Sequence, residues 1–301
     1  MSPILRRAAK QVVEVVLEGS GISALARRRM GGRDIVLAYH GVVEDGAVHA
    51  DASAHLAVSS FAAQMEAIAE LAEVVPVGAL SAPPRRRDRP RVAITFDDGY
   101  RGALRHAVPI LTALGLPATF FVCPSLLGGE HFWWDCRSLD VWQRKPELLD
   151  RLEGRAERVW PRLREEGFGT EALGDDFRPA SIEEVRAAAA APGITVGSHT
   201  MRHPNLAVLG MDAVRAELGE AHRWLSAQVP SYLPWIAYPF GLATPEVERV
   251  AEELGYAGGF VLDGGWIPAT GARRYGLPRL NIAAGLSTRG FRIRLADIFA
   301  R

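Results

Sequence analysis

Four residues of this chain have the types and the spacing that metal-dependent hydrolysis requires. Asp97 and Asp98 are adjacent carboxylates that follow an apolar run. His199 and His203 are two imidazoles four positions apart. Neighbouring like charges raise each other's pKa, so the two aspartates are costly unless a positive charge lies nearby. A metal ion would supply that charge if one carboxylate bound it and the other stayed free to accept a proton.

The two histidines could complete such a metal site. On a helix, a spacing of four positions would place both imidazoles on one face. Pro204 disfavours the α conformation at His203, however, so we expect the pair to straddle a strand end and a turn. Asp98, His199 and His203 would then form a three-ligand site with open positions, as hydrolytic zinc sites do. Zn²⁺ is the favoured ion, and Co²⁺, Mn²⁺ or Ni²⁺ would suit the same donors.

The position of the two motifs strengthens a signal that is weak in each motif alone. An Asp-Asp-Gly sequence is usually only a turn, and a single His-x-x-x-His spacing is often structural. Here both motifs come at the end of predicted buried strands, at 91–96 and 194–199. Barrel enzymes carry their active sites at the carboxyl ends of parallel strands. The coincidence therefore favours one metal site over two unrelated turns.

Strands and helices alternate along the chain in the order that a parallel sheet requires. The predicted strands cover 35–40, 91–96, 118–123, 194–199, 235–241, 257–262 and 279–282. Between them lie predicted helices, including 101–114, one that begins with a capping box at Ser181 and Glu184, and one capped by Thr244. The segment 44–58 is small and polar and is predicted to be a loop. This alternation favours a (β/α) barrel of seven or eight units over an open sheet.

Two segments fall outside that alternation. Residues 1–34 are predicted to be an N-terminal helical extension, and residues 35–301 to be the barrel domain. Within that domain, about 125–180 reads as a helical insertion that contains Phe132, Trp133 and Trp134. These tryptophans could stack on sugar rings, or they could belong to the core.

Composition excludes several classes of protein. Of the 301 residues, 48% are hydrophobic and 23% are charged, as in an ordinary globular protein. The 35 basic residues equal the 35 acidic ones, so no overall charge favours nucleic acid as a partner. Two cysteines do not form a disulfide framework, and Cys123 is expected to be a buried, inert thiol. Nothing in the pattern indicates an oligomeric state.

The N-terminal residues do not resemble a secretory signal, because Glu14 and Glu18 interrupt the stretch after the first basic residues. No segment approaches the length needed to cross a bilayer. We therefore expect a cytoplasmic protein. A helix over 4–17 could contact the inner face of the membrane peripherally, but a soluble helix that packs on the domain is favoured, since its polar face also carries acids.

Three short motifs resemble those of the polysaccharide deacetylase (NodB-homology) family. They are Thr95-Phe96-Asp97-Asp98-Gly99, Ser198-His199-Thr200-Met201-Arg202-His203 and Ala237-Tyr238-Pro239-Phe240-Gly241. Ser60-Phe61, Phe132-Trp133-Trp134 and Leu277-Pro278-Arg279 also fit one branch of that family. The likeness covers about 35–285. It implies a distorted (β/α)7-type barrel and a metal-dependent removal of N-acetyl groups from amino sugars.

The resemblance also implies a role for each motif residue. Asp97 would be the general base, with Asp98, His199 and His203 as metal ligands, while the backbone N–H of Phe240 would help to hold the oxyanion. The physical requirements agree with these roles. The metal must polarise a poorly electrophilic amide and lower the pKa of a bound water, and the departing amine needs a proton from a general acid.

Two departures from the family pattern concern the groups around the base. The third motif often begins with an arginine that positions the base, and here that position is Ala237. Arg279 is the candidate substitute, because it lies at the start of a late strand; the alternative is an ordinary structural ion pair. The usual acid is a C-terminal histidine, yet no histidine follows His222. His40 ends an early strand and is preferred as the acid over a purely structural role.

The favoured function is therefore a metal-dependent deacetylase that acts on an N-acetylated saccharide, with a lipid-linked or nucleotide-linked precursor as one option. A second interpretation keeps the barrel and the metal but hydrolyses another amide or imide bond. A third is a catalytically silent carbohydrate-binding protein. Asp97 argues against the third, since binding alone does not need a base.

Overall fold

The computed structural model describes residues 33–47, 54–81, 89–136, 146–168, 173–262, 264–268, 270–284 and 286–295. The predicted N-terminal extension over 1–34, with its helix over 4–17, lies outside the described residues except for its last two positions. Among the residues that the structure describes, none of the helices combines the length and the apolar character needed to span a membrane.

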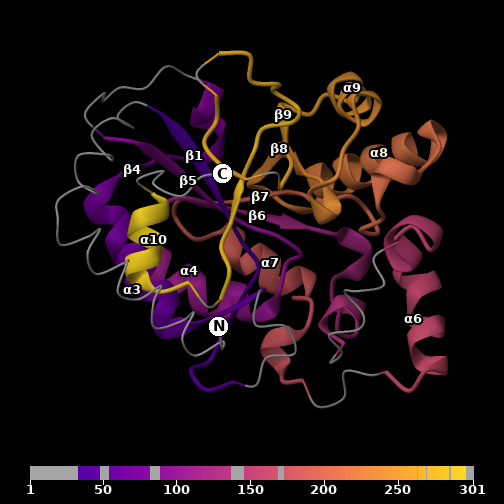
Figure 1. The fold of residues 1–301 in the computed structure, drawn as a ribbon, viewed down its shortest axis with the longest axis horizontal. Coiled ribbons are helices and arrows are strands. Elements are labelled where there is room, and N and C mark those ends of the chain that lie inside the picture. The colour runs from indigo at the N-terminus through magenta and orange to yellow at the C-terminus, as the bar shows by residue number, and fades with distance from the viewer. Residues whose placement is uncertain are drawn as a thin grey trace, which may run out of the picture.

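A ring of parallel strands forms the centre of the molecule (Figure 1). Its strands are β1 (Asp34–Tyr39), β5 (Arg91–Phe96), β6 (Ala118–Val122), β7 (Ile194–Ser198), β8 (Tyr232–Ala237), β9 (Gly258–Phe260) and β10 (Leu280–Asn281). They follow the order β10-β1-β5-β6-β7-β8-β9, and every pair is parallel. The short strand β4 (Glu73–Val74) joins the start of β5.

The segment 277–281 closes the ring. At its start Leu277 bridges Phe260 of β9, and the N–H of Leu277 donates to the Gly259 carbonyl at 2.9 Å. At its end Leu280 and Asn281 pair with β1. One short segment thus bonds to both edge strands, and because β9 and β10 are only three and two residues long, the barrel is distorted at this seam. The distorted (β/α)7-type barrel expected from the sequence is confirmed.

The central strands β5 and β6 are buried on both faces, which explains their apolar residues. In β5, Val92, Ile94 and Phe96 belong to the large core that the sheet shares with the surrounding helices. The residues between them, Ala93 and Thr95, point to the barrel interior, because successive side chains on a strand alternate between faces. The interior is filled by a smaller apolar cluster: Val36, Val77, Ala93, Phe121, Trp235, Ala237, Phe260 and Leu277.

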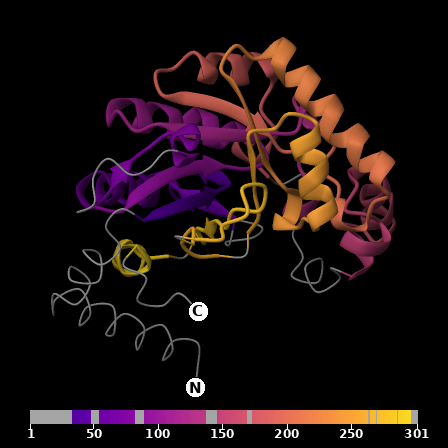
Figure 2. The same cartoon turned by 90° about the horizontal axis from the view of Figure 1, so that it is seen from above.

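Helices cover the outside of the barrel. They are α3 (Val58–Leu71), the π-helical turn η2 (Ala103–Ala107) that continues into α4 (Val108–Ala113), α7 (Ile182–Ala189), α8 (Met211–Gln228), α9 (Pro245–Glu253) and α10 (Thr288–Arg294). In Figure 2, α8 and α9 (orange) lie on the opposite side of the molecule from the N-terminal strands. Helix α10 lies beside α3, where Arg292 pairs with Glu70 at 2.7 Å.

The helix starts predicted from capping residues are confirmed. The Ser181 hydroxyl accepts from the Glu184 N–H at 3.2 Å, and the Glu184 carboxylate accepts from the Ser181 N–H at 2.7 Å. Thr244 caps α9 with a single bond, in which its hydroxyl accepts from the Val247 N–H at 3.4 Å, and Pro245 is the first helical residue. These two caps fix where the chain turns away from the barrel before α7 and α9.

The predicted loop over 44–58 is wrong at its end. Strand β2 (Gly41–Val43) pairs in parallel with β3 (His55–Ala57), and α3 begins directly afterwards at Val58. A three-residue strand is too short to give a clear alternation, and β3 is stabilised by tertiary pairing rather than by its own propensity. This small sheet places the buried His55 beside the end of β1.

The segment between β6 and α7 is built from short helices in its described parts. They are η3 (Pro124–Leu126), η4 (Trp133–Asp135), the π-helical turn η5 (Pro146–Arg151), α6 (Ala156–Glu165) and η6 (Asp175–Phe177). Its aromatic residues divide by role. Trp133 is fully buried and donates its indole N–H to the Gly154 carbonyl at 3.1 Å, whereas Trp134 lines a cavity.

Candidate metal centre and active site

The carboxyl ends of several strands surround a cavity of about 440 Å³. His40 follows β1, Asp97 and Asp98 follow β5, and His199 follows β7. Residues that are distant in the sequence meet here because parallel strands present their carboxyl ends to the same rim. The residues that line the cavity are His40, Ala54, Asp97, Asp98, Trp134, Pro146, Leu149, Asp150, His199, His203, Phe240, Leu242, Leu262 and Asn281.

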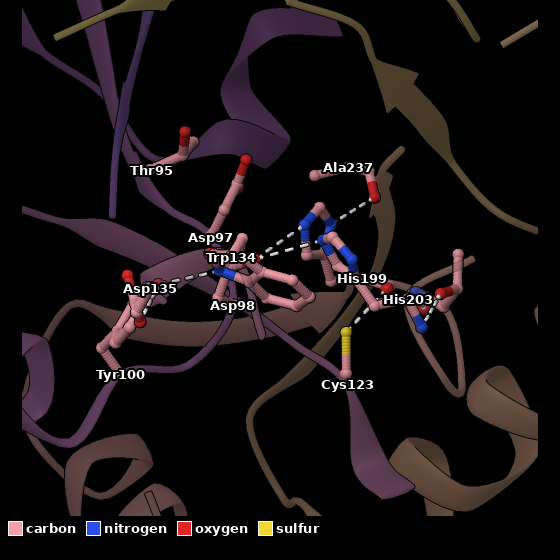
Figure 3. A network of polar contacts seen from close by, with 12 residues as sticks. Thr95, Asp97, Asp98, Tyr100, Cys123, Trp134, Asp135, His199, His203 and Ala237 are labelled. Atoms are coloured by element: carbon pink, nitrogen blue, oxygen red, sulfur yellow. Dashed lines mark hydrogen bonds and ion pairs between the residues drawn. The ribbon is translucent and has the colours of Figure 1, made fainter. Parts of the chain in front are cut away.

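Asp98, His199 and His203 form a compact, buried cluster of metal-ligand types (Figure 3). The Nε2 atoms of His199 and His203 each lie 3.3 Å from Oδ1 of Asp98. The three donor atoms lie within 4.8 Å of one another. Two imidazole nitrogens and one carboxylate oxygen that face a cavity are a donor set that Zn²⁺ and other divalent first-row ions accept.

The backbone at these candidate ligands is locally strained. Asp98 has a φ of 70°, Thr200 of 67° and His203 of 59°. Residues other than glycine rarely occupy this left-handed region, and such strain collects at functional sites. β7 ends at Ser198, so the two histidines straddle a strand end and a turn, as the proline at 204 predicts. The Thr200 hydroxyl holds that turn by accepting from the His203 N–H at 3.0 Å.

Contacts behind the two imidazoles fix their orientation. Nδ1 of His199 lies 2.7 Å from the Ala237 carbonyl, which can only accept, so Nδ1 carries a proton and Nε2 is the nitrogen that could bind a metal ion once it has lost its own proton. The His203 ring lies between two aromatic side chains, with centroid distances of 4.3 Å to Trp134 and 4.7 Å to Phe240. The thiol of Cys123, buried as predicted, donates to the His199 carbonyl at 2.9 Å.

Electrostatics of the cluster also suit a cation. Burial raises the pKa of Asp98, but hydrogen bonds from the two imidazoles outweigh it and hold this pKa well below its usual value. Burial lowers the pKa of His203. It also acts to lower the pKa of His199, but the charges of Asp97 and Asp98 raise that pKa overall. An ionised carboxylate beside two ring nitrogens therefore fits a divalent ion, which would replace the protons that the rings share with Asp98.

Asp97 is held by Arg279 rather than by the histidines. Nη1 and Nη2 of Arg279 donate to Oδ1 and Oδ2 of Asp97 at 2.7 and 2.6 Å, and Nη1 also donates to the Thr95 hydroxyl at 3.1 Å. The two charged side chains are 1% and 0% exposed. Burial would raise the pKa of Asp97, but the Arg279 guanidinium and the His199 ring lower it below its usual value. Asp97 is therefore an ionised carboxylate that faces the cavity.

The structure also brings His40 and Phe240 to this cavity. His40 lies at its wall, and its Nδ1 is buried without a hydrogen-bond partner among the residues that the structure describes. Phe240 belongs to η8 (Pro239–Gly241) and has a φ of 58°, which turns the chain sharply after β8. Of the residues predicted for the site, six line the cavity, and Arg279 contacts it through Asp97.

Some residues of the cavity were not singled out from the sequence. Leu149 and Asp150 come from η5 in the insertion, and no spacing in the sequence links them to the motifs. Asn281 could have been found, because it lies two positions after Arg279 in the strand predicted over 279–282, which would place both side chains on one face. His55 received no role, yet it is completely buried and bonded to Asp135 at 2.8 Å.

Comparison with known proteins agrees with this architecture. The deacetylase PplD of Streptococcus pyogenes, solved in complex with acetate, superposes with a TM-score of 0.60 at 19% identity, covering 86% of this chain and 96% of PplD. IcaB from Ammonifex degensii gives 0.60 at 17% identity, covering 89% and 98%. The polysaccharide deacetylase BC0361 from Bacillus cereus gives 0.61 at 16%, covering 87% and 69%. At these identities the likeness establishes the fold.

Sequence comparison gives the family. YxkH of Bacillus subtilis (strain 168), whose own assignment as a polysaccharide deacetylase is provisional, is 23% identical over 203 residues. That match covers 66% of this chain and 54% of YxkH, so the chain spans about half the length of the curated relative it matches. The sequence model of the polysaccharide deacetylase family matches residues 85–259, which is more than half of the chain. The chain therefore belongs to the polysaccharide deacetylase family.

Proposed function

We propose that this protein is a metal-dependent hydrolase that removes N-acetyl groups from an amino-sugar glycan or glycan precursor. One observation carries the proposal. The buried donors of Asp98, His199 and His203 lie beside Asp97, an ionised carboxylate that binds arginine instead of joining the cluster. Family membership supports deacetylation as the reaction. PplD, of similar fold, was solved with acetate, the product that this reaction would release.

The residues around the cavity divide the work of amide hydrolysis. A divalent ion held by Asp98, His199 and His203 would polarise the acyl carbonyl and lower the pKa of a water molecule. Asp97, ionised and fixed by Arg279, accepts the proton of the attacking water. The N–H of Phe240 stabilises the negative charge that develops on the acyl oxygen.

His40 then protonates the departing amine. This histidine ends β1 on the cavity wall, and its buried Nδ1 has no partner within the described protein. A leaving amine requires a proton because its anion is a very poor leaving group. Among the described residues, His40 is the one histidine of the cavity wall that lies outside the cluster of metal-ligand types.

The walls of the cavity suit a saccharide. Trp134, Phe240 and Leu149 offer apolar surface to one face of a pyranose ring, while Asp150 and Asn281 offer polar atoms to hydroxyl groups. The volume of about 440 Å³ lies within the range typical of small-molecule sites.

Acetate release from N-acetylated oligosaccharides, measured with and without a chelator, tests the proposal. Chelation should abolish release, and added Zn²⁺ should restore it. Asp97→Asn should lower kcat by on the order of 10²–10⁴-fold while metal content stays near normal. His203→Ala should lose bound metal, as determined by elemental analysis. Melting temperatures of both variants control for misfolding.

Two results would overturn the proposal. Acetate release that survives both chelation and Asp97→Asn would remove the metal and the base from the mechanism. Hydrolysis of a simple amide or imide, with no release from any saccharide, would assign the site to other C–N bonds. Comparison of polymeric, lipid-linked and nucleotide-linked substrates then identifies the glycan.

A further inference from the structure

A chain of buried polar side chains lies behind the cavity wall, and no step of the proposed reaction uses it (Figure 3). The indole N–H of Trp134 donates to the Tyr100 hydroxyl at 2.9 Å. Tyr100 donates to Oδ2 of Asp135 at 3.0 Å, and Nε2 of His55 lies 2.8 Å from Oδ1 of the same carboxylate. Tyr100, Asp135 and His55 are at most 1% exposed, and Trp134 is 6% exposed.

The direction of every hydrogen bond in this chain follows from its first member. An indole N–H can only donate, so the Tyr100 oxygen must accept and direct its own proton to Asp135. The Asp135 carboxylate therefore accepts from Tyr100, and its second oxygen accepts from the His55 ring. With these three hydrogen bonds formed, the indole has one preferred orientation.

Ring packing reinforces this arrangement. The His55 ring lies edge-on to Tyr100 with centroids 4.9 Å apart. Tyr100 lies edge-on to Phe132 at 4.7 Å, and Phe132 stacks on Trp134 at 4.8 Å and 11°. Well-packed apolar residues would stabilise such a position as well as a buried polar network does. The polar chain therefore argues for orientation rather than for stability alone.

The two ends of the chain lie on two parts of the candidate active site. At one end, the Trp134 ring packs against the His203 ring, with ring centroids 4.3 Å apart, and lines the cavity. At the other end, His55 occupies the space beside Gly41, where an added Cβ would lie 2.0 Å from the ring. Gly41 directly follows His40. Position 41 is thus a glycine because the imidazole needs that space.

We propose that Tyr100 and Asp135 are positioning residues that hold the Trp134 indole against His203, and so set both the orientation of this ligand and one wall of the substrate cavity. The kinetic part of the inference rests on the proposed function. The metal-binding part concerns only the described side chains, and it can be measured without a substrate.

Zinc affinity of Tyr100→Phe, measured by competition with a chromophoric chelator, is the first test. The variant keeps the ring and removes only the hydroxyl that accepts from Trp134. Groups that orient a metal ligand typically change affinity on the order of 10–100-fold, so we expect a loss of about tenfold. Tyr232→Phe is the matched control, because its hydroxyl bonds His222 at 2.7 Å away from the cavity. It should leave zinc affinity unchanged.

A double-mutant cycle tests whether the effect passes through one hydrogen bond. Trp134→Phe should lower zinc affinity at least as much as Tyr100→Phe, because it removes the same donor and part of the ring over His203. Adding Tyr100→Phe to Trp134→Phe should cause little further loss. Losses that multiply would overturn the inference, and so would unchanged affinity in a folded Tyr100→Phe variant.

Asp135 provides a second route if Tyr100→Phe does not fold. The amide oxygen of Asn can still accept the Tyr100 proton, so Asp135→Asn should retain more zinc affinity than Asp135→Ala. Equal affinities in the two variants would contradict the role of Asp135.

At saturating Zn²⁺, KM for the saccharide should rise several-fold in Tyr100→Phe with kcat changed less. Absence of deacetylation in the wild-type protein would refute the proposed function and leave the zinc measurements decisive for this inference.

Discussion

At the scale of single residues, Asp97 is a charged group in a buried place. Removing a carboxylate from water costs several kcal/mol unless a partner compensates. Arg279 compensates with two parallel hydrogen bonds, and its guanidinium lies 5.8 Å from the ring centre of Phe121 and 5.7 Å from that of Phe260. The pair keeps Asp97 ionised and fixes the plane of its carboxylate, which a proton acceptor requires.

Arg279→Met should therefore destabilise the protein strongly. It leaves the Asp97 charge buried without a partner, so the free energy of unfolding should fall by about 3–5 kcal/mol. Urea-induced unfolding at neutral pH measures it. The double variant Asp97→Asn with Arg279→Met removes both charges and should recover part of the loss. A loss of less than about 1 kcal/mol, as for a surface ion pair, would contradict this account.

The residues of the candidate site differ in how far the sequence could predict them. Asp98, His199 and His203 could be chosen because donor types recur at the ends of two predicted strands, and the structure brings them together. Arg279 was chosen because it begins a predicted late strand, and in the structure it donates hydrogen bonds to Asp97. The role of Asp97 as the base and that of Arg279 in positioning it stay predictions. Trp134 could not be separated from Trp133, since no periodicity says which of two adjacent residues faces a cavity.

At the scale of elements, the turn after β8 controls the shape of the cavity. Gly241 has a φ of 70°, and a Cβ there would lie 2.3 Å from Cβ of Leu262. Phe240 on one side and Leu262 on the other both line the cavity. The turn is thus tight for two reasons: a left-handed backbone conformation and a close approach of the segment that follows β9.

Gly241→Ala compared with Gly115→Ala separates these two causes. Gly115 has a φ of 65° but nothing within 4 Å of an added Cβ, so only backbone strain of about 1–2 kcal/mol is expected. Gly241→Ala adds the overlap with Leu262, so it should cost more stability and also reduce acetate release. Urea unfolding and the deacetylase assay measure the two effects. Equal losses of stability in both variants would contradict the prediction, because they would mean that the overlap of the new Cβ with Leu262 costs nothing.

Elements were predictable from the sequence where burial is uniform and long. β5 and β7 are rich in apolar residues because both of their faces are covered. The starts of α7 and α9 are marked by capping residues in the sequence. β3 was missed because a three-residue strand depends on its partner β2 for its existence. The His55–Asp135–Tyr100 chain was also missed, since common residue types far apart in sequence give no local signal of their contact.

At the scale of the whole molecule, the pH dependence of stability should include a contribution from His222. Burial, and then the charge of Arg223, lowers the pKa of His222 below its ordinary value. His222 therefore binds a proton more readily in the unfolded chain than in the folded protein. As a result, stability falls as the pH drops below about 6.5, and it levels off below the folded-state pKa.

His222→Gln should remove that part of the pH dependence. The difference in unfolding free energy between wild type and variant should shift in favour of the variant as pH is lowered from 8 to about 5.5. Urea unfolding at a series of pH values measures it, and taking the difference cancels the carboxylates that titrate in both proteins. A difference that is constant across this range would contradict the assignment.

Closure of the barrel through 277–281 has a consequence for the order in which the protein is made. Asp97 leaves the ribosome long before Arg279, its partner 182 positions later. Until that late segment has been synthesised, β1 and β9 are open edges that can pair with other chains, and the Asp97 carboxylate lacks its arginine partner. Addition of this one segment during synthesis therefore both covers the exposed strand edges and neutralises the buried carboxylate.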